Sequence, residues 1–321
     1  MLHKYLFTIT GIALILLSSC VKEDFSHCPT EITIAYHLSE FTPKDGFSLR
    51  AAPTPPYATT EENVVEYLYL FLFPTTMGQT VKKYFLSSPT LSGVGFVGTF
   101  ENLEGNITLS LSPATAGVRD VYLVANCDAD LKTALDAVET VEALKAVMRE
   151  NTTAPWTMTT PLLMSGKSLA HDFATTPTLN KVTLTRAVAK LQIEVTLGAA
   201  HQSATHSDYG YKYLNFGTKT YVLPKPSEQT NTAGHSDWQT FTFIPENLGA
   251  GDKVNSFTLT TYINEYAEGQ TPEILAAKVQ FKFPYNPDGM PPPEFGDDIY
   301  TIQLPAGVER NMLFYYNVSV Q

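Results

Sequence analysis

Apolar and polar residues alternate over short stretches of this chain, which is the pattern of β-strands with one buried face. The stretch TEITIAYHL at 30–38 has this period of two, typical of a half-buried strand. Its apolar positions are Ile32, Ile34, Tyr36 and Leu38. The stretch VVEYLYLFLF at 64–73 is apolar at almost every position and predicts a central strand covered on both faces. Further strands are expected at 81–86, 95–100, 107–111, 118–126, 182–197, 219–223, 238–244, 257–262, 278–283, 300–304 and 313–320.

One region follows the helical period instead. Between Asp130 and Glu150, apolar residues recur every three or four positions. They are Leu131, Leu135, Val138, Val141, Leu144 and Met148. Asp130 is suited to cap the start, so we expect a single helix that packs on a sheet as a crossover. The following residues, 151–177, show neither period and are interpreted as mostly loop.

Many short strands and one helix predict a mainly β protein made of β-sandwiches. About 300 residues without a leader exceed the usual size of one core, so we expect two domains. The expected divisions are a signal peptide at 1–19, a tether at 20–29, and domains at 30–178 and 179–321. Within the strand at 182–197, Arg186 and Lys190 are expected to face solvent or the neighbouring domain.

The chain begins like an exported lipoprotein. Lys4 precedes an apolar run of roughly a dozen residues, which fits a signal peptide and is shorter than the roughly 20 residues of a membrane-spanning helix. The run ends in Leu17-Ser18-Ser19-Cys20, a lipobox in which Cys20 is the expected site of lipidation. Acyl chains on Cys20 would hold the protein on a membrane surface. The alternative is an ordinary signal peptide with an incidental cysteine.

Charge narrows the class of partner. The 21 basic and 32 acidic residues become 20 and 32 once Lys4 is removed, a net charge near −12. Such a surface repels phosphate backbones, and the sequence has no cluster of Lys and Arg, so nucleic acid is not an expected partner.

Two cysteines remain after Cys20. Cys28 and Cys127 are a candidate disulfide in an oxidising compartment. The loop between them has about a hundred residues, for which the chain-entropy model gives roughly 4 to 5 kcal/mol. Two separate thiols are the alternative.

No motif predicts catalysis. The stretch Met164-Ser165-Gly166-Lys167-Ser168 ends like a phosphate loop, but position 161 is proline where that motif needs glycine. The spacing of His201, His206 and Asp208 does not fit zinc, and we expect solvated loop histidines. The acidic residues Asp288, Glu294, Asp297 and Asp298 lack the order of a calcium loop. We therefore expect no catalytic residue, metal or cofactor, and not an enzyme.

An ordered set of phrases resembles a known family. CVKEDFSHCP, VEYLYLFLFP, MSGKS, LTRAVAKLQIEV, FIPENLG and RNMLFYYNVSV occur in the order expected of the fimbrillin superfamily of type V pili, and the lipobox cysteine followed by Cys-Pro is most similar to its fimbrium anchoring subunit family. The resemblance implies two transthyretin-like β-sandwich domains and a surface-exposed, lipid-anchored place at the outer membrane, in a fimbrium. It also implies shaft and minor fimbrial subunits as partners, engaged by donor-strand addition.

The resemblance leaves the role open. In polymerising members, a protease cuts after an arginine in the loop that follows the first strand, and here that loop contains Arg50-Ala51. An anchor would stay uncut, because cleavage would separate the body from the lipid on Cys20, and a Cys28–Cys127 disulfide would lock its first strand. The alternatives are a shaft or tip subunit matured after Arg50, or a surface glycan-binding lipoprotein. The last would use aromatic residues: Trp156, Tyr209, Tyr211, Tyr213 and Trp238. The sequence specifies no host or glycan ligand.

Overall fold

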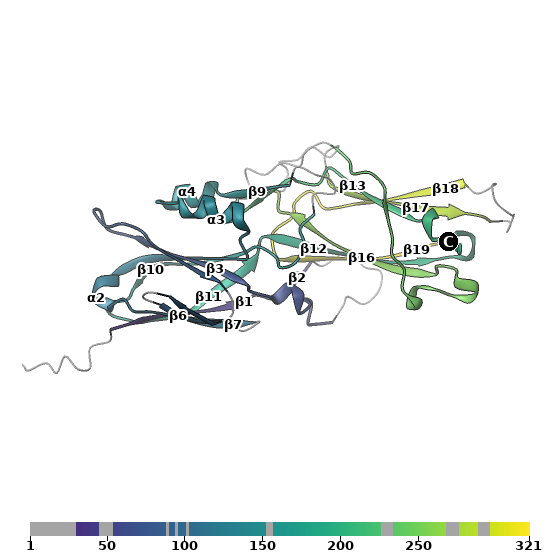
Figure 1. Ribbon diagram of the computed structural model, residues 1–321. Coiled ribbons are helices and arrows are strands. Elements are labelled where there is room, and N and C mark those ends of the chain that lie inside the picture. Colours follow the sequence, from purple (N-terminus) through teal and green to yellow (C-terminus); the bar gives the residue numbers. More distant parts are fainter. Residues whose placement is uncertain are drawn as a thin grey trace, which may run out of the picture.

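The computed structural model describes residues 30–44, 54–87, 90–93, 96–100, 103–151, 157–225, 234–267, 276–287 and 296–321. The chain forms two β-sandwich domains that lie end to end (Figure 1). The expected fold class, mainly β with two sandwich domains, is confirmed. Within the described residues, no helix has the length and apolar character needed to cross a membrane.

Nine strands build the N-terminal domain. Their spatial order is β4, β3, β8, β10, β11, β1, β7, β6, β5. Their bounds are β1 Ile32–Leu38, β3 Tyr67–Pro74, β4 Lys82–Ser87, β5 Thr90–Gly93, β6 Phe96–Phe100, β7 Glu104–Leu109, β8 Val118–Ala125, β10 Met164–Asp172 and β11 Thr178–Arg186. A one-turn helix, α2 (Pro113–Ala116), precedes β8. The expected strands at 64–73, 81–86, 95–100, 107–111 and 118–126 therefore exist.

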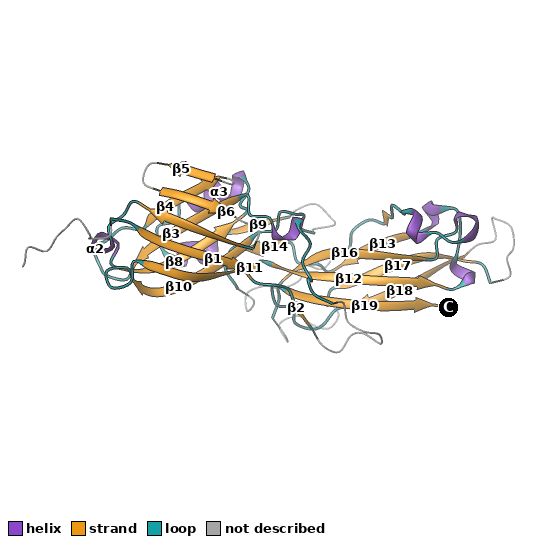
Figure 2. Cartoon of the chain, turned by 90° about the horizontal axis from the view of Figure 1, so that it is seen from below, coloured by secondary structure: helices purple, strands orange, loops and turns teal. Residues whose placement is uncertain are grey.

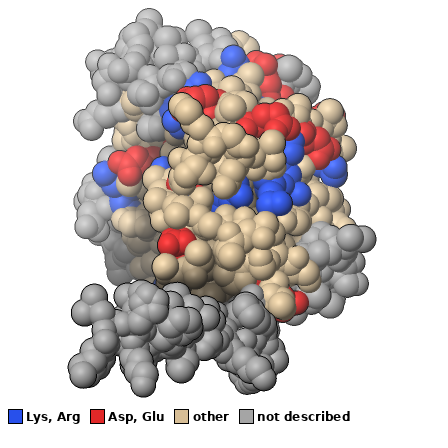
Figure 3. Space-filling view, turned by 90° about the vertical axis from the view of Figure 1, so that its left-hand side faces the viewer, with Lys and Arg blue, Asp and Glu red and all other residues tan. Residues whose placement is uncertain are grey.

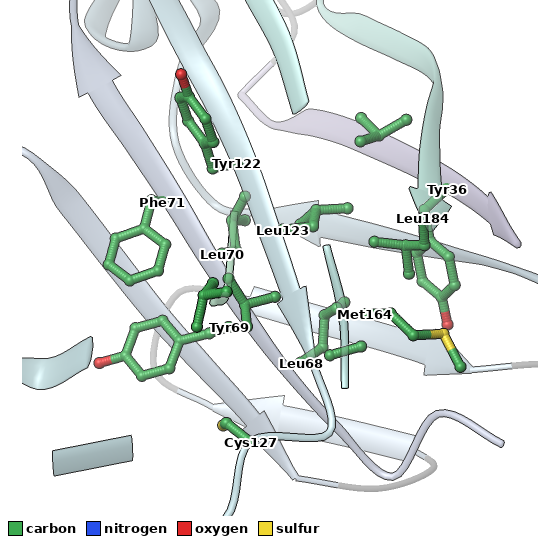
Figure 4. Packing of buried hydrophobic residues seen from close by; sticks show 14 of the residues in the cluster. Tyr36, Leu68, Tyr69, Leu70, Phe71, Tyr122, Leu123, Cys127, Met164 and Leu184 are labelled. Atoms are coloured by element: carbon green, nitrogen blue, oxygen red, sulfur yellow. The ribbon is translucent and has the colours of Figure 1, made fainter. Parts of the chain in front are cut away.

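The nine-stranded sheet folds over at β10 and β11, which pair only through Met164 with Arg186 and Ser165 with Thr185. One layer holds β4, β3, β8 and β10, and the other holds β11, β1, β7, β6 and β5; Figure 2 labels most of these strands. Buried apolar residues of β1, β3, β4, β7, β8, β10 and β11 share one core, part of which is shown in Figure 4. The backbones approach closely at Gly166, where a Cβ atom would lie 2.3 Å from the Thr183 carbonyl oxygen. The stretch MSGKS is thus a seam of the sandwich, and its glycine allows the two layers to meet.

Strand β3 is buried on both faces, as its uniformly apolar sequence predicts. Leu68, Leu70 and Leu72 alternate with three stacked aromatic residues. The aromatic residues are Tyr69, Phe71 and Phe73. The helices α3 (Ala129–Asp136) and α4 (Val141–Ala146) lie over the outside of this layer (Figure 1). The Tyr69 hydroxyl donates a hydrogen bond to Asp136 of α3.

The expectation of one continuous helix from Asp130 to Glu150 was wrong, because the structure has two helices there, α3 and α4. Asp128 caps α3, Thr140 caps α4, and each cap side chain accepts a backbone N–H of its own helix. The chain is extended at Thr140, which breaks the helix. Beyond α4, Met148 belongs to a strand, β9 (Met148–Glu150).

The C-terminal domain is a sandwich of two four-stranded sheets around a second core. One sheet is ordered β16 (Ser256–Asn264), β12 (Val188–Leu197), β19 (Met312–Val320), β2 (Thr42–Pro43), and the other β15 (Gln239–Thr240), β13 (Gly210–Leu214), β17 (Lys278–Tyr285), β18 (Gly296–Gln303). Only residues 239–240 of the strand expected at 238–244 are in a ladder. Strand β2 comes from the N-terminal part of the chain and completes the edge beside β19.

Two expectations around the domain boundary need correction. Residues 151–177 were interpreted as loop, but they include the nine-residue strand β10, whose exposed side chains Lys167, Leu169 and Ala170 show no regular alternation of apolar and polar residues. The run at 182–197 divides at Ala187 into β11 and β12, which belong to different domains. Because β11 pairs with β1 along its length, the boundary expected between residues 178 and 179 moves to Ala187.

Buried polar contacts join the domains. Strand β14 (Lys219–Tyr221) pairs with β9 across the junction. Near them, Arg310 forms a buried ion pair with Glu265 and donates to the carbonyl oxygens of Tyr221 and Val222, each at 3.2 Å. Because these contacts use main chain from several elements, they fix one domain against the other.

Candidate functional site

The most unusual feature of the structure is the course of residues 30–44, called here the N-terminal segment. Its first part, β1, lies inside the N-terminal sandwich between β7, with which it is antiparallel, and β11, with which it is parallel. Its last part, β2, lies parallel to β19 in the C-terminal sandwich. One extended segment therefore contributes a strand to both domains (Figure 1).

Strand β1 is a central strand of its sheet, and its alternation is confirmed. The inward residues Ile32, Ile34, Tyr36 and Leu38 are each at most 8% exposed. Figure 4 shows Tyr36 beside Met164 and Leu184 in the shared core. At about 1.5 to 3 kcal/mol for each buried side chain, these four contribute on the order of 6 to 12 kcal/mol. The sandwich depends on having a strand in this place.

The connection between β1 and β2 is held mainly through its backbone. Ser39 N donates to the Leu184 carbonyl oxygen at 2.9 Å, and Thr42 N donates to the Asn311 carbonyl oxygen at 2.9 Å. Lys44 N donates to the Leu313 carbonyl oxygen at 3.0 Å. Between these anchors, the Phe41 ring is 1% exposed. The segment thus crosses the junction with its main chain paired and one aromatic side chain inserted.

Arg186, at the end of β11, contacts this connection. Its guanidinium donates to the Ser39 carbonyl oxygen at 2.7 Å and lies 4.4 Å from the Phe41 ring centroid, in the range of a cation–π contact. It also donates to the Glu62 carbonyl oxygen, to the Asn311 side-chain oxygen and to Asn63. Burial lowers the pKa of Arg186, and the nearby carboxylates Glu40 and Glu62 oppose that shift. Arg186 is only 1% exposed and therefore needs all these acceptors.

A second buried charge pair adjoins Arg186. Lys190 of β12 donates to the Glu62 carboxylate at 2.9 Å and to the Tyr57 carbonyl oxygen at 2.9 Å. The same carboxylate accepts from the Tyr262 hydroxyl at 2.5 Å and from Thr59 N at 2.7 Å. Burial, followed by the hydrogen bond to Glu62, raises the pKa of Tyr262. We call Glu62, Arg186, Lys190, Tyr262 and Asn311 the junction cluster.

The sequence identified only part of this cluster. Arg186 and Lys190 are 1% and 4% exposed, so the solvent-facing alternative was wrong and the one facing the neighbouring domain was right. Glu62, Tyr262 and Asn311 were missed, because polar residues in strands and loops usually face water. The signal available in the sequence was the stretch RAVAK, in which Arg186 and Lys190 flank three apolar residues. Two cations in an apolar strand require buried partners, so this stretch indicates that acceptors lie nearby in the fold.

The candidate lipidation site Cys20, the candidate disulfide partner Cys28 and the candidate processing site Arg50-Ala51 lie outside the described residues. Cys127 is described; it is the second residue after the end of β8 and is 3% exposed (Figure 4). Burial raises the pKa of the Cys127 thiol to about 11.

Strand directions locate Cys127 relative to β1. Strands β8 and β1 run the same way, because β8 is antiparallel to β10, β10 is antiparallel to β11, and β11 is parallel to β1. Ile32 therefore lies at the end of the sandwich where β8 starts, and Cys127 lies beyond the other end of β8. The eight residues of β8 span roughly 26 Å. Pairing of Cys28 with Cys127 stays a prediction, because Cys28 lies outside the described residues.

Other sequence candidates lie apart from the junction cluster. His201 is 0% exposed and contacts Asp298 at 3.1 Å, so the expectation of a solvated loop histidine was wrong for this residue. Tyr209 and Tyr213 are buried in the C-terminal core, which leaves neither ring free to stack on a sugar. Trp156, Asp288 and Glu294 lie outside the described residues. Within the part that is described, no three His, Cys, Asp or Glu side chains gather as a metal site would need.

Surface charge is mixed at the end of the molecule that the N-terminal domain forms. Figure 3 shows Lys and Arg beside Asp and Glu there, in small groups on a largely uncharged surface. Among the described residues seen in this view, Lys and Arg do not form an extended basic field of the kind that binds a phosphate backbone.

Comparison with known proteins identifies the family. A family model described as the major fimbrial subunit protein (FimA) matches residues 47–212. A second, described as the C-terminal part of the minor fimbrium tip subunit MfA4, matches residues 187–319 and so begins at Ala187, where the domains meet. The minor fimbrium tip subunit MfA4 of Porphyromonas gingivalis is 32% identical over 351 aligned residues, covering 99% of this chain and 100% of that protein.

One solved structure shares the fold with a TM-score above 0.5, and a second resembles it more distantly. A candidate cell adhesion protein from Bacteroides eggerthii superposes with a TM-score of 0.53 at 18% identity, over 90% of this chain and 86% of that one. A candidate cell adhesion protein from Parabacteroides distasonis has a TM-score of 0.46 at 12% identity, over 91% and 92%. The two family models and the full-length relative lead to one conclusion: the chain is a fimbrial subunit and belongs to the Bacteroidales-type fimbrillin family.

Proposed function

We propose that this chain is a minor subunit at the tip of a fimbrium, exported as a lipoprotein and assembled by β-strand addition after cleavage at Arg50-Ala51. A relative that aligns over its entire length is a tip subunit, which supports the tip position. The lipobox ending in Cys20 supports export with a lipid at the outer membrane.

The course of the N-terminal segment is the observation that carries the proposal. The only covalent connection between residues 30–44 and the chain from residue 54 onward is the stretch 45–53, which contains Arg50 and Ala51. If that stretch is cut, β1 and β2 are retained by non-covalent contacts alone, unless the predicted Cys28–Cys127 disulfide ties them. The match to the major fimbrial subunit family begins at residue 47, after both strands, which is consistent with a body that starts near the cut.

Departure of β1 would create an acceptor for another strand. It would expose the facing edges of β7 and β11 and empty the positions of four buried side chains. Unpaired edges beside an apolar trough bind extended peptides through main-chain hydrogen bonds, while the side-chain positions give specificity. A strand from the neighbouring subunit would restore the sheet and join the two subunits.

The chain that remains after cleavage keeps its own attachment. Glu62 and Tyr57, which follow the cut, contact Lys190 of the C-terminal domain. The residues after Ala51 would therefore stay bound to the body while the N-terminal segment leaves with its lipid.

The anchoring role expected from the sequence is the alternative. An anchor keeps its N-terminal segment and its lipid, so cleavage separates the two roles. We therefore propose to compare the wild type with Arg50→Ala, using Lys44→Ala as a control that removes a nearby exposed cation. In the tip role, Arg50→Ala abolishes the shortened form and its presence in sheared fimbriae, whereas Lys44→Ala changes neither. Unchanged size and fimbrial content of the Arg50→Ala protein would contradict the tip role and favour the anchor.

A further inference from the structure

The junction cluster contacts the N-terminal segment at residues that lie after the end of β1. Arg186 contributes one hydrogen bond, to the Ser39 carbonyl oxygen, and one ring contact, to Phe41. Asn311 donates from its side-chain amide to the Glu40 carbonyl oxygen at 2.6 Å and to the Ser39 hydroxyl at 3.1 Å. These contacts all fall on three consecutive residues, 39–41, between the two strands.

Loss of the segment would leave this place incompletely satisfied. Arg186 would keep its acceptors on Asn63, Glu62 and Asn311, but it would lose the Ser39 oxygen and the Phe41 ring that covers it. Asn311 would lose both acceptors of its amide. Buried donors without acceptors are costly, so whatever fills the acceptor is favoured if it supplies two carbonyl oxygens and a ring at the same places.

On this basis we infer that the junction cluster is a second recognition site of the acceptor, specific for an aromatic residue three positions after the last inward residue of the incoming strand. This inference rests on the proposed strand addition. Any peptide supplies the carbonyl oxygens, so the aromatic side chain carries the selectivity. Recognition by Arg186 and Lys190, which lie 4.4 and 5.6 Å from the Phe41 centroid, favours the electron-rich face of a ring over an aliphatic side chain.

The partner is thereby described by its pattern. It is an extended segment of a second fimbrial subunit with four apolar residues at alternate positions, followed three positions later by an aromatic residue. In this chain the four apolar residues are Ile32, Ile34, Tyr36 and Leu38, and the aromatic residue is Phe41. It runs parallel to β11 and then to β19. From the start of β1 to the end of β2 it spans the equivalent of residues 32–43, roughly 40 Å if extended.

The test uses the full chain with a specific protease site inserted between Arg50 and Ala51, so that the segment can be released. After cleavage, fluorescent synthetic peptides of residues 30–44 are added, and their entry and release are followed by anisotropy. Three peptides are compared: the natural sequence, Phe41→Ala, and Thr42→Ala as the matched control. The Thr42 side chain is exposed, while its backbone N–H makes the hydrogen bond to Asn311 in either peptide.

We expect the Phe41→Ala peptide to dissociate at least about 30-fold faster than the natural one, because it loses a buried ring and its cation–π contacts. The dissociation rate of the Thr42→Ala peptide should stay within about 2-fold of that of the natural peptide, because substitutions of exposed side chains have small effects. The natural peptide should also be released faster from an Arg186→Gln chain but not from a Lys181→Gln chain, since Lys181 is an exposed cation on the same strand.

The outcomes separate the inference from the function on which it rests. Equal release of the natural and Phe41→Ala peptides from the natural chain would overturn the recognition by the junction cluster and leave strand addition standing. Failure of the natural peptide to enter the cleaved chain at all would overturn strand addition itself. Because the peptide variants leave the protein unchanged, the result does not depend on whether Arg186→Gln folds.

Discussion

Replacement of Lys190 by methionine tests whether the junction cluster holds the two domains and the residues after Ala51 together. Lys190 is 4% exposed, and its ammonium group is the only cation within 4.0 Å of the Glu62 carboxylate among the described residues. Methionine has a similar length and fills the same space, so Lys190→Met removes the charge without leaving a large cavity.

The expected loss in the free energy of unfolding depends on the partners that the Glu62 carboxylate retains. After the substitution, the carboxylate still accepts from Tyr262 and Thr59 N, but it stays buried without an ion-pair partner. Breaking a buried pair at one partner costs about 3 to 5 kcal/mol. Arg186 lies nearby and offsets part of the loss, so we expect about 3 kcal/mol, the lower end of that range.

Guanidinium unfolding of the uncut chain measures this cost. The matched control is Lys181→Met, which removes an exposed lysine from β11 and should change the free energy of unfolding by less than about 0.5 kcal/mol. The double variant Lys190→Met/Glu62→Gln removes both charges and should be more stable than Lys190→Met alone, because no unpaired buried charge remains. A loss for Lys190→Met as small as that of the control would refute the reasoning.

Two further predictions concern stability. Gly166→Ala should destabilise the chain by about 1 to 3 kcal/mol, because the added methyl group meets the Thr183 carbonyl oxygen of strand β11. In the same unfolding assay, Lys167→Ala, at the exposed neighbouring residue, should leave the free energy of unfolding unchanged, and equal effects of the two substitutions would contradict the close approach of β10 and β11. Burial raises the pKa of Tyr209 to about 12, above the ordinary value near 10 of the unfolded chain. The unfolded state therefore loses the Tyr209 proton first, and the contribution of Tyr209 to stability falls as pH rises from 10 to 12. Tyr209→Phe should flatten the profile of Tm against pH in that range. An unchanged profile would contradict the raised pKa of Tyr209.

The sequence predicted the strands whose side chains follow a simple burial rule. Strand β1 alternates because one face meets the core, and β3 is apolar throughout because the helices cover its other face. Strand β10 escaped prediction, since its outward residues follow no period and Gly166 serves a backbone contact. The helix was expected to be continuous because Thr140 falls between two stretches with the same apolar period.

The candidate site was harder to predict, because it is assembled from distant parts of the chain. Glu62 and Lys190 are 128 positions apart, and Ser39 and Asn311 are 272 apart. Neither pairing has a local pattern. The strand pattern that runs unbroken through Ala187 also hid the boundary between the domains, since β11 and β12 are both core strands and no loop-like linker separates them.

The most direct test of the central claim is the intact mass of the chain recovered separately from sheared native fimbriae and from outer membranes. The tip role with strand addition predicts a chain in fimbriae that begins at Ala51, free of lipid, with the acylated form starting at Cys20 confined to membranes as precursor. A full-length chain that begins at acylated Cys20 in both fractions, with no form starting at Ala51, would contradict it.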